Sequence, residues 1–134
     1  KRVKLLEAVA EDAAVEQGWA MVARAEATGE SSEWAKAKSY FGTLIGQYPR
    51  SERVAAATLN GVGRCLLDED PRTALLKFVE AEVVHFGAKK EVARALYLKA
   101  LAYEKLGGAR NKKMAEEARK ELREFFPGSE WATK

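Results

Sequence analysis

Few side chains in this sequence could carry nucleophilic or metal chemistry. There is one histidine, His85, and one cysteine, Cys65, which lie 20 residues apart on different predicted helices. A Cys/His or Ser/His/Asp site would have to use His85, and a metal site needs about three or four clustered ligands. We predict instead that His85 ends a helix, where the helix dipole favours a cation, and that Cys65 is a small buried side chain. A single cysteine also excludes an intrachain disulfide.

Neighbouring glutamates are the remaining candidates for acid–base catalysis. They occur at Glu80/Glu82 and Glu116/Glu117. Side chains one or two positions apart on a helix point in different directions, so we predict solvent-facing charges rather than a working pair. The sequence has no phosphate-binding loop with its lysine and no glycine-rich turn between a strand and a helix. We therefore expect a protein that is not an enzyme and that uses no cofactor and no metal.

Basic residues are concentrated in the last third of the chain. Residues 1–88 contain 11 Lys/Arg and 13 Asp/Glu, a net charge of −2, whereas residues 89–134 contain 12 and 7, a net charge of +5. This excess would suit acidic partners or membrane headgroups, but the interspersed glutamates are also typical of a solvated helix face. Four basic residues cluster at one predicted turn: Lys105, Arg110, Lys112 and Lys113. Because few aromatic residues accompany them, nucleic acid is not an expected partner.

Hydrophobic periodicity predicts an all-α protein. Alanine, leucine, lysine, arginine and glutamate dominate, and apolar residues recur at spacings of three and four. The six expected helices cover about residues 2–28, 32–47, 52–66, 71–86, 90–106 and 111–126. The first is either one long helix or two helices with a break near Glu11-Asp12. No apolar run reaches the roughly 18 residues that cross a bilayer, so no membrane span is predicted.

Capping residues and glycines support these helices. Ser32, Ser51 and Asp70 are the predicted N-caps, and Pro71 takes the first position of its helix, where no backbone N–H is required. The glycine pair Gly42/Gly46 lies on one helical face and predicts close approach of a neighbouring backbone. A second pair, Gly61/Gly63, predicts crowding around a helix that is apolar on more than one face.

A helix stop recurs at a nearly fixed interval. The tetrapeptide Tyr48-Pro49-Arg50-Ser51 resembles Phe126-Pro127-Gly128-Ser129, and His85-Phe86-Gly87-Ala88 is a decayed copy between them. Counted between their aromatic residues, Tyr48, Phe86 and Phe126, the intervals are 38 and 40 residues. A period of about 40 indicates stacked helical repeats, and the short connections within them favour antiparallel neighbours.

A common pattern of large and small residues precedes each stop. The three copies are Ala25, Ala37, Phe41 and Leu44; Leu59, Gly63, Leu66, Ala74 and Phe78; and Leu96, Ala100, Tyr103 and Ala115. Large, small and large residues on a first helix, followed by a small residue and an aromatic on a second, resemble the tetratricopeptide repeat family. The long period and the aromatic-proline stop are similar to a subgroup that includes the C-terminal domain of the Tol-Pal-associated cell-division coordinator and the lipoprotein of the outer-membrane barrel-assembly machinery.

This resemblance covers about residues 13–134. It implies one domain, folded as a right-handed superhelix of three antiparallel helix pairs. The implied repeats are about 13–50, 51–88 and 89–128, with 1–12 as an N-terminal helical extension. In the third repeat, Arg119 stands where the family has an apolar or aromatic residue. Trp131 either enters a further helix or folds back as a cap.

The resemblance also implies a function. In this family the first helix of each pair lines a concave face that binds peptides or helices, so the chain would be a non-catalytic protein-interaction scaffold. The implied groove positions are Ala57, Asn60, Arg64 and Leu67 on the third helix and Arg94, Tyr97, Leu101 and Glu104 on the fifth. Asn60 would hydrogen-bond a peptide backbone, whereas Arg64 and Arg94 would pair with a carboxylate. Tyr97 would offer an amphipathic contact of the kind found at hot spots.

Two other roles stay open. One alternative is self-association as a homo-oligomer through the terminal repeats, with Trp131 in the contact surface. The other is an accessory segment of a larger enzyme or envelope complex. The resemblance implies the bacterial periplasm or cell envelope as its location. In the main interpretation, the basic last repeat would steer acidic protein partners toward the groove.

Overall fold

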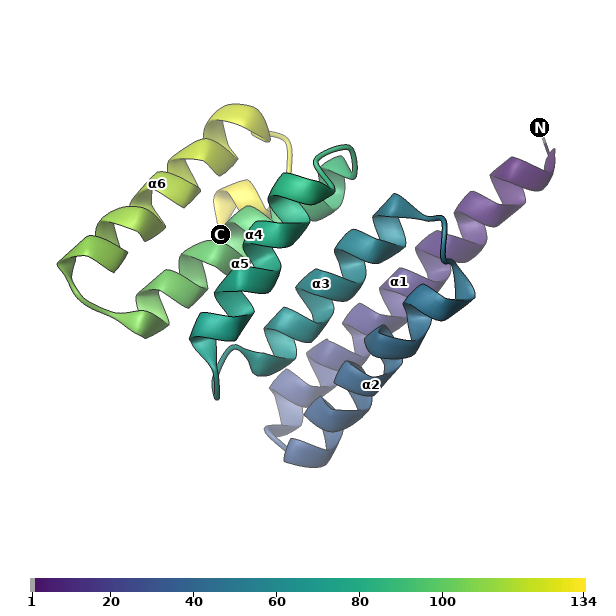
Figure 1. The fold of residues 1–134 in the computed structure, drawn as a ribbon, viewed down its shortest axis with the longest axis horizontal. Coiled ribbons are helices and arrows are strands. Elements are labelled where there is room, and N and C mark those ends of the chain that lie inside the picture. Colours follow the sequence, from purple (N-terminus) through teal and green to yellow (C-terminus); the bar gives the residue numbers. More distant parts are fainter. Residues whose placement is uncertain (1) are drawn as a thin grey trace.

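The computed structural model describes residues 2–134, which form six α-helices and a short 3₁₀ helix (Figure 1). Their bounds are α1 Arg2–Thr28, α2 Ser31–Gln47, α3 Glu52–Leu66, α4 Pro71–Val84, α5 Lys89–Leu106, α6 Ala109–Phe125 and the 3₁₀ helix η1 Glu130–Thr133. No strand occurs among these residues, so the all-α prediction is confirmed. The first helix is continuous, and the alternative of a break near Glu11-Asp12 is wrong.

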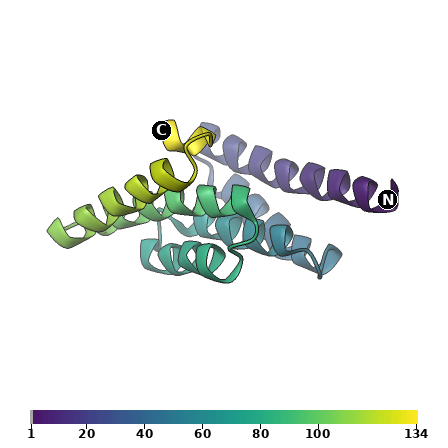
Figure 2. The ribbon, with the colours of Figure 1, turned by 90° about the horizontal axis from the view of Figure 1, so that it is seen from above.

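Each helix packs against the next one along the chain, as in an α-helical solenoid. In addition, α3 contacts both α1 and α5, and η1 contacts α5 and α6. The two views show α1, α2 and α3 grouped in one half of the molecule and α4, α5 and α6 in the other, with the N-terminal turns of α1 projecting at one end (Figures 1 and 2). Because α3 has neighbours on so many sides, little of its surface is left for solvent.

Local capping explains where the helices begin. The Ser51 hydroxyl accepts a hydrogen bond from the Val54 N–H at 3.1 Å, and the Asp70 carboxylate accepts one from the Thr73 N–H at 3.2 Å, with Pro71 first in α4. These predicted caps are confirmed. The predicted Ser32 cap is wrong, because the N-cap of α2 is Glu30, two residues earlier, and it makes no side-chain capping bond. Instead Gly29, with φ of +69°, reverses the chain there.

Glycines make room for two buried phenylalanines. The Phe41 ring lies against Gly18 of α1 and Gly61 of α3, and a Cβ atom built on Gly18 would lie 2.5 Å from Phe41 Cζ. Similarly, a Cβ on Gly63 would lie 2.5 Å from Phe78 Cε1. The predicted crowding at Gly61 and Gly63 is confirmed, and its cause is aromatic side chains.

The prediction for the other glycine pair is wrong. Neither Gly42 nor Gly46 has an atom within 4 Å of a built Cβ, because their side of α2 faces open space. The shared face that these two residues form on the helix is therefore not an approach site for another backbone.

The repeated stop has the same local structure at both of its intact copies. The backbone N–H of Ser51 donates to the Tyr48 carbonyl at 3.1 Å, and that of Ser129 donates to the Phe126 carbonyl at 3.0 Å. Each serine hydroxyl also accepts a bond from the helix that follows, from the Val54 N–H and the Trp131 N–H respectively. The chain then forms the single 3₁₀ turn η1, with Trp131 packed on Ala93, Leu96 and Leu122. Of the two alternatives for Trp131, the structure has it folded onto α5 and α6.

Candidate functional site

The first helix of each pair contributes side chains to one cavity of about 380 Å³. It lies between α1, α3 and α5, and its wall also includes Glu130 and Trp131 of η1 and Lys134 after it. Four of the predicted groove residues line it: Arg64, Arg94, Tyr97 and Leu101. We call this cavity the inner groove.

Arg94 lines the inner groove and is largely buried. Its guanidinium carbon lies 4.1 Å from the ring centroid of Trp19 on α1 and 4.6 Å from that of Trp131 on η1. A guanidinium stacked on an indole gains both dispersion and cation–π attraction. The residue thus joins the first helix of the chain to its last helical turn through α5.

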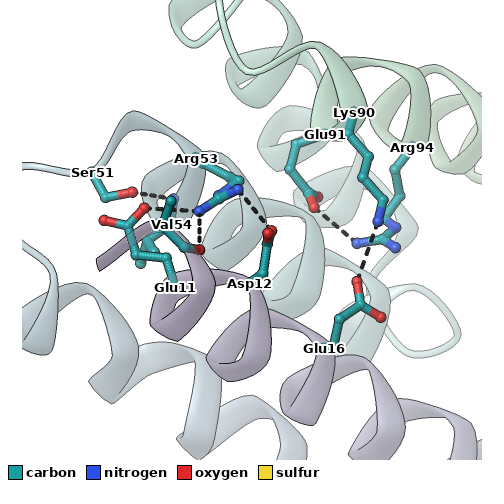
Figure 3. A network of polar contacts seen from close by, with 10 residues as sticks. Glu11, Asp12, Glu16, Ser51, Arg53, Val54, Lys90, Glu91 and Arg94 are labelled. Carbon is teal, nitrogen blue, oxygen red and sulfur yellow. Dashed lines mark hydrogen bonds and ion pairs between the residues drawn. The ribbon is translucent and has the colours of Figure 1, made fainter. Parts of the chain in front are cut away.

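A buried polar chain fixes Arg94 from the other side. Arg94 Nη1 donates to Glu91 Oε2 at 2.9 Å, and the two side chains are seen together in Figure 3. Glu91 in turn accepts two hydrogen bonds from Asn60 Nδ2, at its backbone oxygen (2.9 Å) and at Oε1 (3.0 Å). A buried carboxylate is tolerated when it is paired and hydrogen-bonded in this way. The network therefore holds α3, α5 and the guanidinium in one arrangement.

Three predicted groove residues, all near or on α3, are buried and are wrong as partner contacts. Asn60 is 0% exposed and is occupied by Glu91, and Leu67 is 2% exposed within the core between α3, α4 and α5. Ala57 is likewise fully buried. The physical reason is that α3 is covered by α1, α2, α4 and α5, so its first-helix positions face neighbouring helices instead of an open surface.

Arg64 lines the groove with its charge already satisfied. Its Nη2 donates to Glu26 Oε2 at 3.0 Å, and its guanidinium carbon lies 4.6 Å from the Trp34 ring centroid. Arg94 is engaged in the same manner by Glu91. A partner carboxylate, the predicted ligand of both arginines, would have to compete with these intramolecular carboxylates.

Tyr97 and Leu101 are the accessible apolar part of the inner groove. Both are half-buried, lie one helical turn apart on α5, and pack against the core below them. Lys134 Nζ lies 5.9 Å from the Tyr97 ring centroid, so the C-terminal residue covers one edge of this surface. Side chains of this type suit an apolar or aromatic anchor from a ligand.

Sequence reasoning missed one member of the site. Trp19 of α1 is part of the groove wall, but it is not among the positions that the repeat pattern assigns to the groove. The chain has three tryptophans, and in the structure each of them lies against an arginine guanidinium. A search for a guanidinium partner for every tryptophan would have drawn attention to it.

Glu104 does not face the groove. It accepts two hydrogen bonds from Arg119 of α6, at 2.8 and 2.9 Å, and this bond holds the pKa of the Glu104 carboxyl below its usual value. The groove position predicted for Glu104 is therefore wrong. Arg119, which departs from the family pattern, has its charge neutralised by this bidentate pair between α5 and α6.

The remaining chemical candidates also have structural partners. Glu82 is half-buried and accepts a hydrogen bond from Lys99 at 2.7 Å, so its predicted solvent-facing position is wrong, whereas Glu116 and Glu117 are exposed. Lys105 of the basic cluster pairs with Asp68 at 2.8 Å, and the hydrogen bond from Lys105 lowers the pKa of Asp68. Burial raises the pKa of the half-buried Cys65 thiol to about 11.

No group of three or more His, Cys, Asp and Glu side chains in residues 2–134 is arranged to hold a metal ion. Within the same residues, no helix combines the length and the apolar character required to cross a membrane. His85 is the C-cap residue of α4, in the place predicted for it.

Comparison with known proteins gives no family or relative from which a function could be inferred. No protein-family model, no curated protein and no solved structure matches it. What the inner groove binds is therefore inferred from its own side chains.

Proposed function

We propose that this chain is a non-catalytic protein-interaction module of the tetratricopeptide type, a right-handed superhelix whose inner groove takes up a peptide or helix of a partner protein. The observation that carries the proposal is the convergence of α1, α3, α5 and η1 on one cavity, with Tyr97 and Leu101 half-buried in its wall. First helices that share an inner surface are what the repeat pattern predicts for a binding face.

The groove chemistry favours an apolar or aromatic anchor residue in the ligand. Each charged group around the cavity has an internal partner: Arg64 with Glu26, Arg94 with Glu91, and Lys134 with Glu130 at 3.9 Å. A ligand charge would gain little at such a neutralised site. The volume of about 380 Å³ lies in the lower part of the range for ligand pockets, which suits one or two side chains of a peptide.

The positive charge of the last repeat would then affect the association rate of an acidic partner more than the affinity of the groove contact. Residues 89–134 carry a net charge of +5, and much of α6 is exposed. Long-range attraction of this kind raises association rates and weakens with added salt. An acidic sequence flanking the apolar anchor would therefore speed binding at low ionic strength.

A displayed library of random peptides, panned against the folded chain, tests the proposal. Peptides with an apolar or aromatic anchor should be enriched, and their affinity is measured by fluorescence anisotropy. The double variant Tyr97→Ala/Leu101→Ala should weaken binding by about tenfold or more, because truncated hot-spot residues cost upwards of about 1 kcal/mol each. The matched control is Leu76→Ala/Val83→Ala on the outer surface of α4. Equal affinity of the groove variant and the wild type would refute the groove as the binding site.

A further inference from the structure

The outer side of α1 has an apolar stripe that nothing in the described structure covers. Leu6 is 67% exposed and Val9 57% exposed, and Val3 and Leu5 beside them are exposed to a similar degree. The side of α1 that faces the core carries a different set, Val15, Gly18, Val22 and Ala25. The outer stripe is thus separate from the surface by which α1 packs on α2 and α3.

The exposed stripe has the spacing of a coiled-coil seam. Its members are Arg2, Leu6, Val9, Ala13 and Glu16, at intervals of four, three, four and three residues, and all five are exposed. Alternating intervals of three and four keep side chains on one line along a helix, the arrangement by which two helices pack together. The seam continues past the turns that α2 and α3 support, along the part of α1 that projects from the molecule (Figures 1 and 2).

Charge complementarity identifies the occupant of the seam. Arg2 at one end is basic and Glu16 at the other is acidic, with Val9 midway between them. When two copies of this seam meet antiparallel about Val9, each Arg2 lies opposite a Glu16, and Leu6 packs near Ala13 of the other copy. A parallel pair would instead place like charges together at both ends, which is unfavourable.

We propose that this chain forms an antiparallel homodimer through the α1 seam, with Val9 at the two-fold axis and Arg2–Glu16 ion pairs at the ends. The internal contacts of α1 are compatible with this arrangement. Arg53 of α3 binds Glu11, Asp12 and the Ala8 carbonyl, none of which belongs to the seam (Figure 3). The five seam side chains stay exposed beside this contact. Glu16 makes only an exposed contact of 3.4 Å to Lys90, so a second cation can approach it.

The dimer is expected to be weak and concentration-dependent. Few large apolar side chains lie in the seam, and a standard interface buries about 800 Å² on each partner. The ion pairs lie at the rim, where each contributes about 1 kcal/mol or less. With few apolar anchors and only rim ion pairs, we expect a dissociation constant in the micromolar range or above.

Sedimentation velocity of the full chain over a series of concentrations tests the proposal. The mass should rise from 14.8 kDa toward twice that value as concentration increases. In Val9→Lys, two ammonium groups meet at the axis, and the dissociation constant should rise about tenfold or more. Leu76→Lys is the matched control, since it places lysine at an equally exposed leucine on α4. Circular dichroism checks that each variant is folded.

Charge-reversal variants test the antiparallel geometry, because a parallel wild-type pair would already bring like charges together and a single reversal would not weaken it further. Arg2→Glu and Glu16→Arg should each weaken self-association, because like charges then meet at both ends of the dimer. In an equal mixture of the two variants, every end of the heterodimer pairs opposite charges, so association should return. A wild type that stays monomeric to millimolar concentration would overturn the proposal and leave the seam to a different partner. Failure of the mixture to associate, or equal disruption by Leu76→Lys, would also overturn it.

Discussion

The Asn60 side chain on α3 donates hydrogen bonds to both the backbone oxygen and Oε1 of Glu91 on α5, at 2.9 and 3.0 Å. This contact crosses between two non-consecutive helices, at the start of α5, and both side chains are buried. It positions Glu91 to pair with Arg94, whose guanidinium lies between Trp19 and Trp131. A polar residue in the middle of α3 thereby sets the position of the arginine in the inner groove.

Asn60→Ala should lower the free energy of unfolding by about 2 kcal/mol, because it leaves the buried Glu91 oxygens without their donor. The loss is limited to the Nδ2 bonds, since Oδ1 has no partner among the described residues. Urea denaturation measures the change. Gln17→Ala, at an exposed position of α1, is the control and should change stability by less than about 0.5 kcal/mol. Equal stabilities for the two variants would contradict the structural role given to Asn60.

Gly61→Ala should destabilise the protein by about 2 kcal/mol, because the added methyl group meets the Phe41 ring inside a packed core. Gly42→Ala tests the opposite case, since it lies within α2 and has no neighbour near a built Cβ. Alanine there should raise stability by about 0.5–1 kcal/mol through the ordinary helix preference. Thermal denaturation distinguishes the two, and changes of the same sign would show that the packing around Phe41 is different from that described.

The Glu104–Arg119 pair should contribute to stability only above acidic pH. The hydrogen bond from Arg119 lowers the folded-state pKa of Glu104, so the contribution is present above the unfolded pKa and is lost as pH falls through the folded value. Glu104→Gln should therefore reduce stability at neutral pH, by about 0.5 kcal/mol for this half-exposed pair, and should match the wild type at pH 2. The control is Glu124→Gln, whose contact with Lys120 is 3.9 Å and exposed.

Alkylation of Cys65 should be slow in the folded protein. Because burial raises the pKa of the thiol to about 11, the thiolate fraction at neutral pH is about a hundredfold lower than for a thiol near pKa 9. Mass spectrometry after iodoacetamide treatment measures the rate, and the same chain in urea provides the reference. Similar rates with and without urea would mean that the thiol is not shielded by the side chains around it.

Much of the fold could be predicted because its signals are local. Ser51, Asp70 and Pro71 act within one turn of the helices that they begin, so their sequence context is sufficient to place those starts. The crowding at Gly61 and Gly63 was also predictable, since a helix apolar on several sides must have neighbours there. The failures at Ser32 and Gly42 have one cause: a residue type suited to capping or to close approach was present, but no neighbouring part of the chain used it.

The candidate site was predictable only in part. The alignment of the chain with the repeat pattern was enough to assign Tyr97 and Leu101 to the cavity wall, because α5 has accessible surface on that side. The same alignment applied to Asn60 and Leu67 placed buried residues on a binding face. The repeat pattern predicts which side of a helix a residue occupies, but it does not predict how much of that side the adjacent helices cover.

The sequence by itself determined the helices, most of their boundaries and their order, since periodicity, capping residues and proline act over a few neighbouring residues. It also determined how scarce reactive side chains are, with one histidine and one cysteine. Only the tertiary structure decided that Arg94 lies between Trp19 and Trp131, residues 112 positions apart in the chain. Such contacts depend on how three helices and a 3₁₀ turn meet in space, and no local pattern records where packing brings distant side chains together.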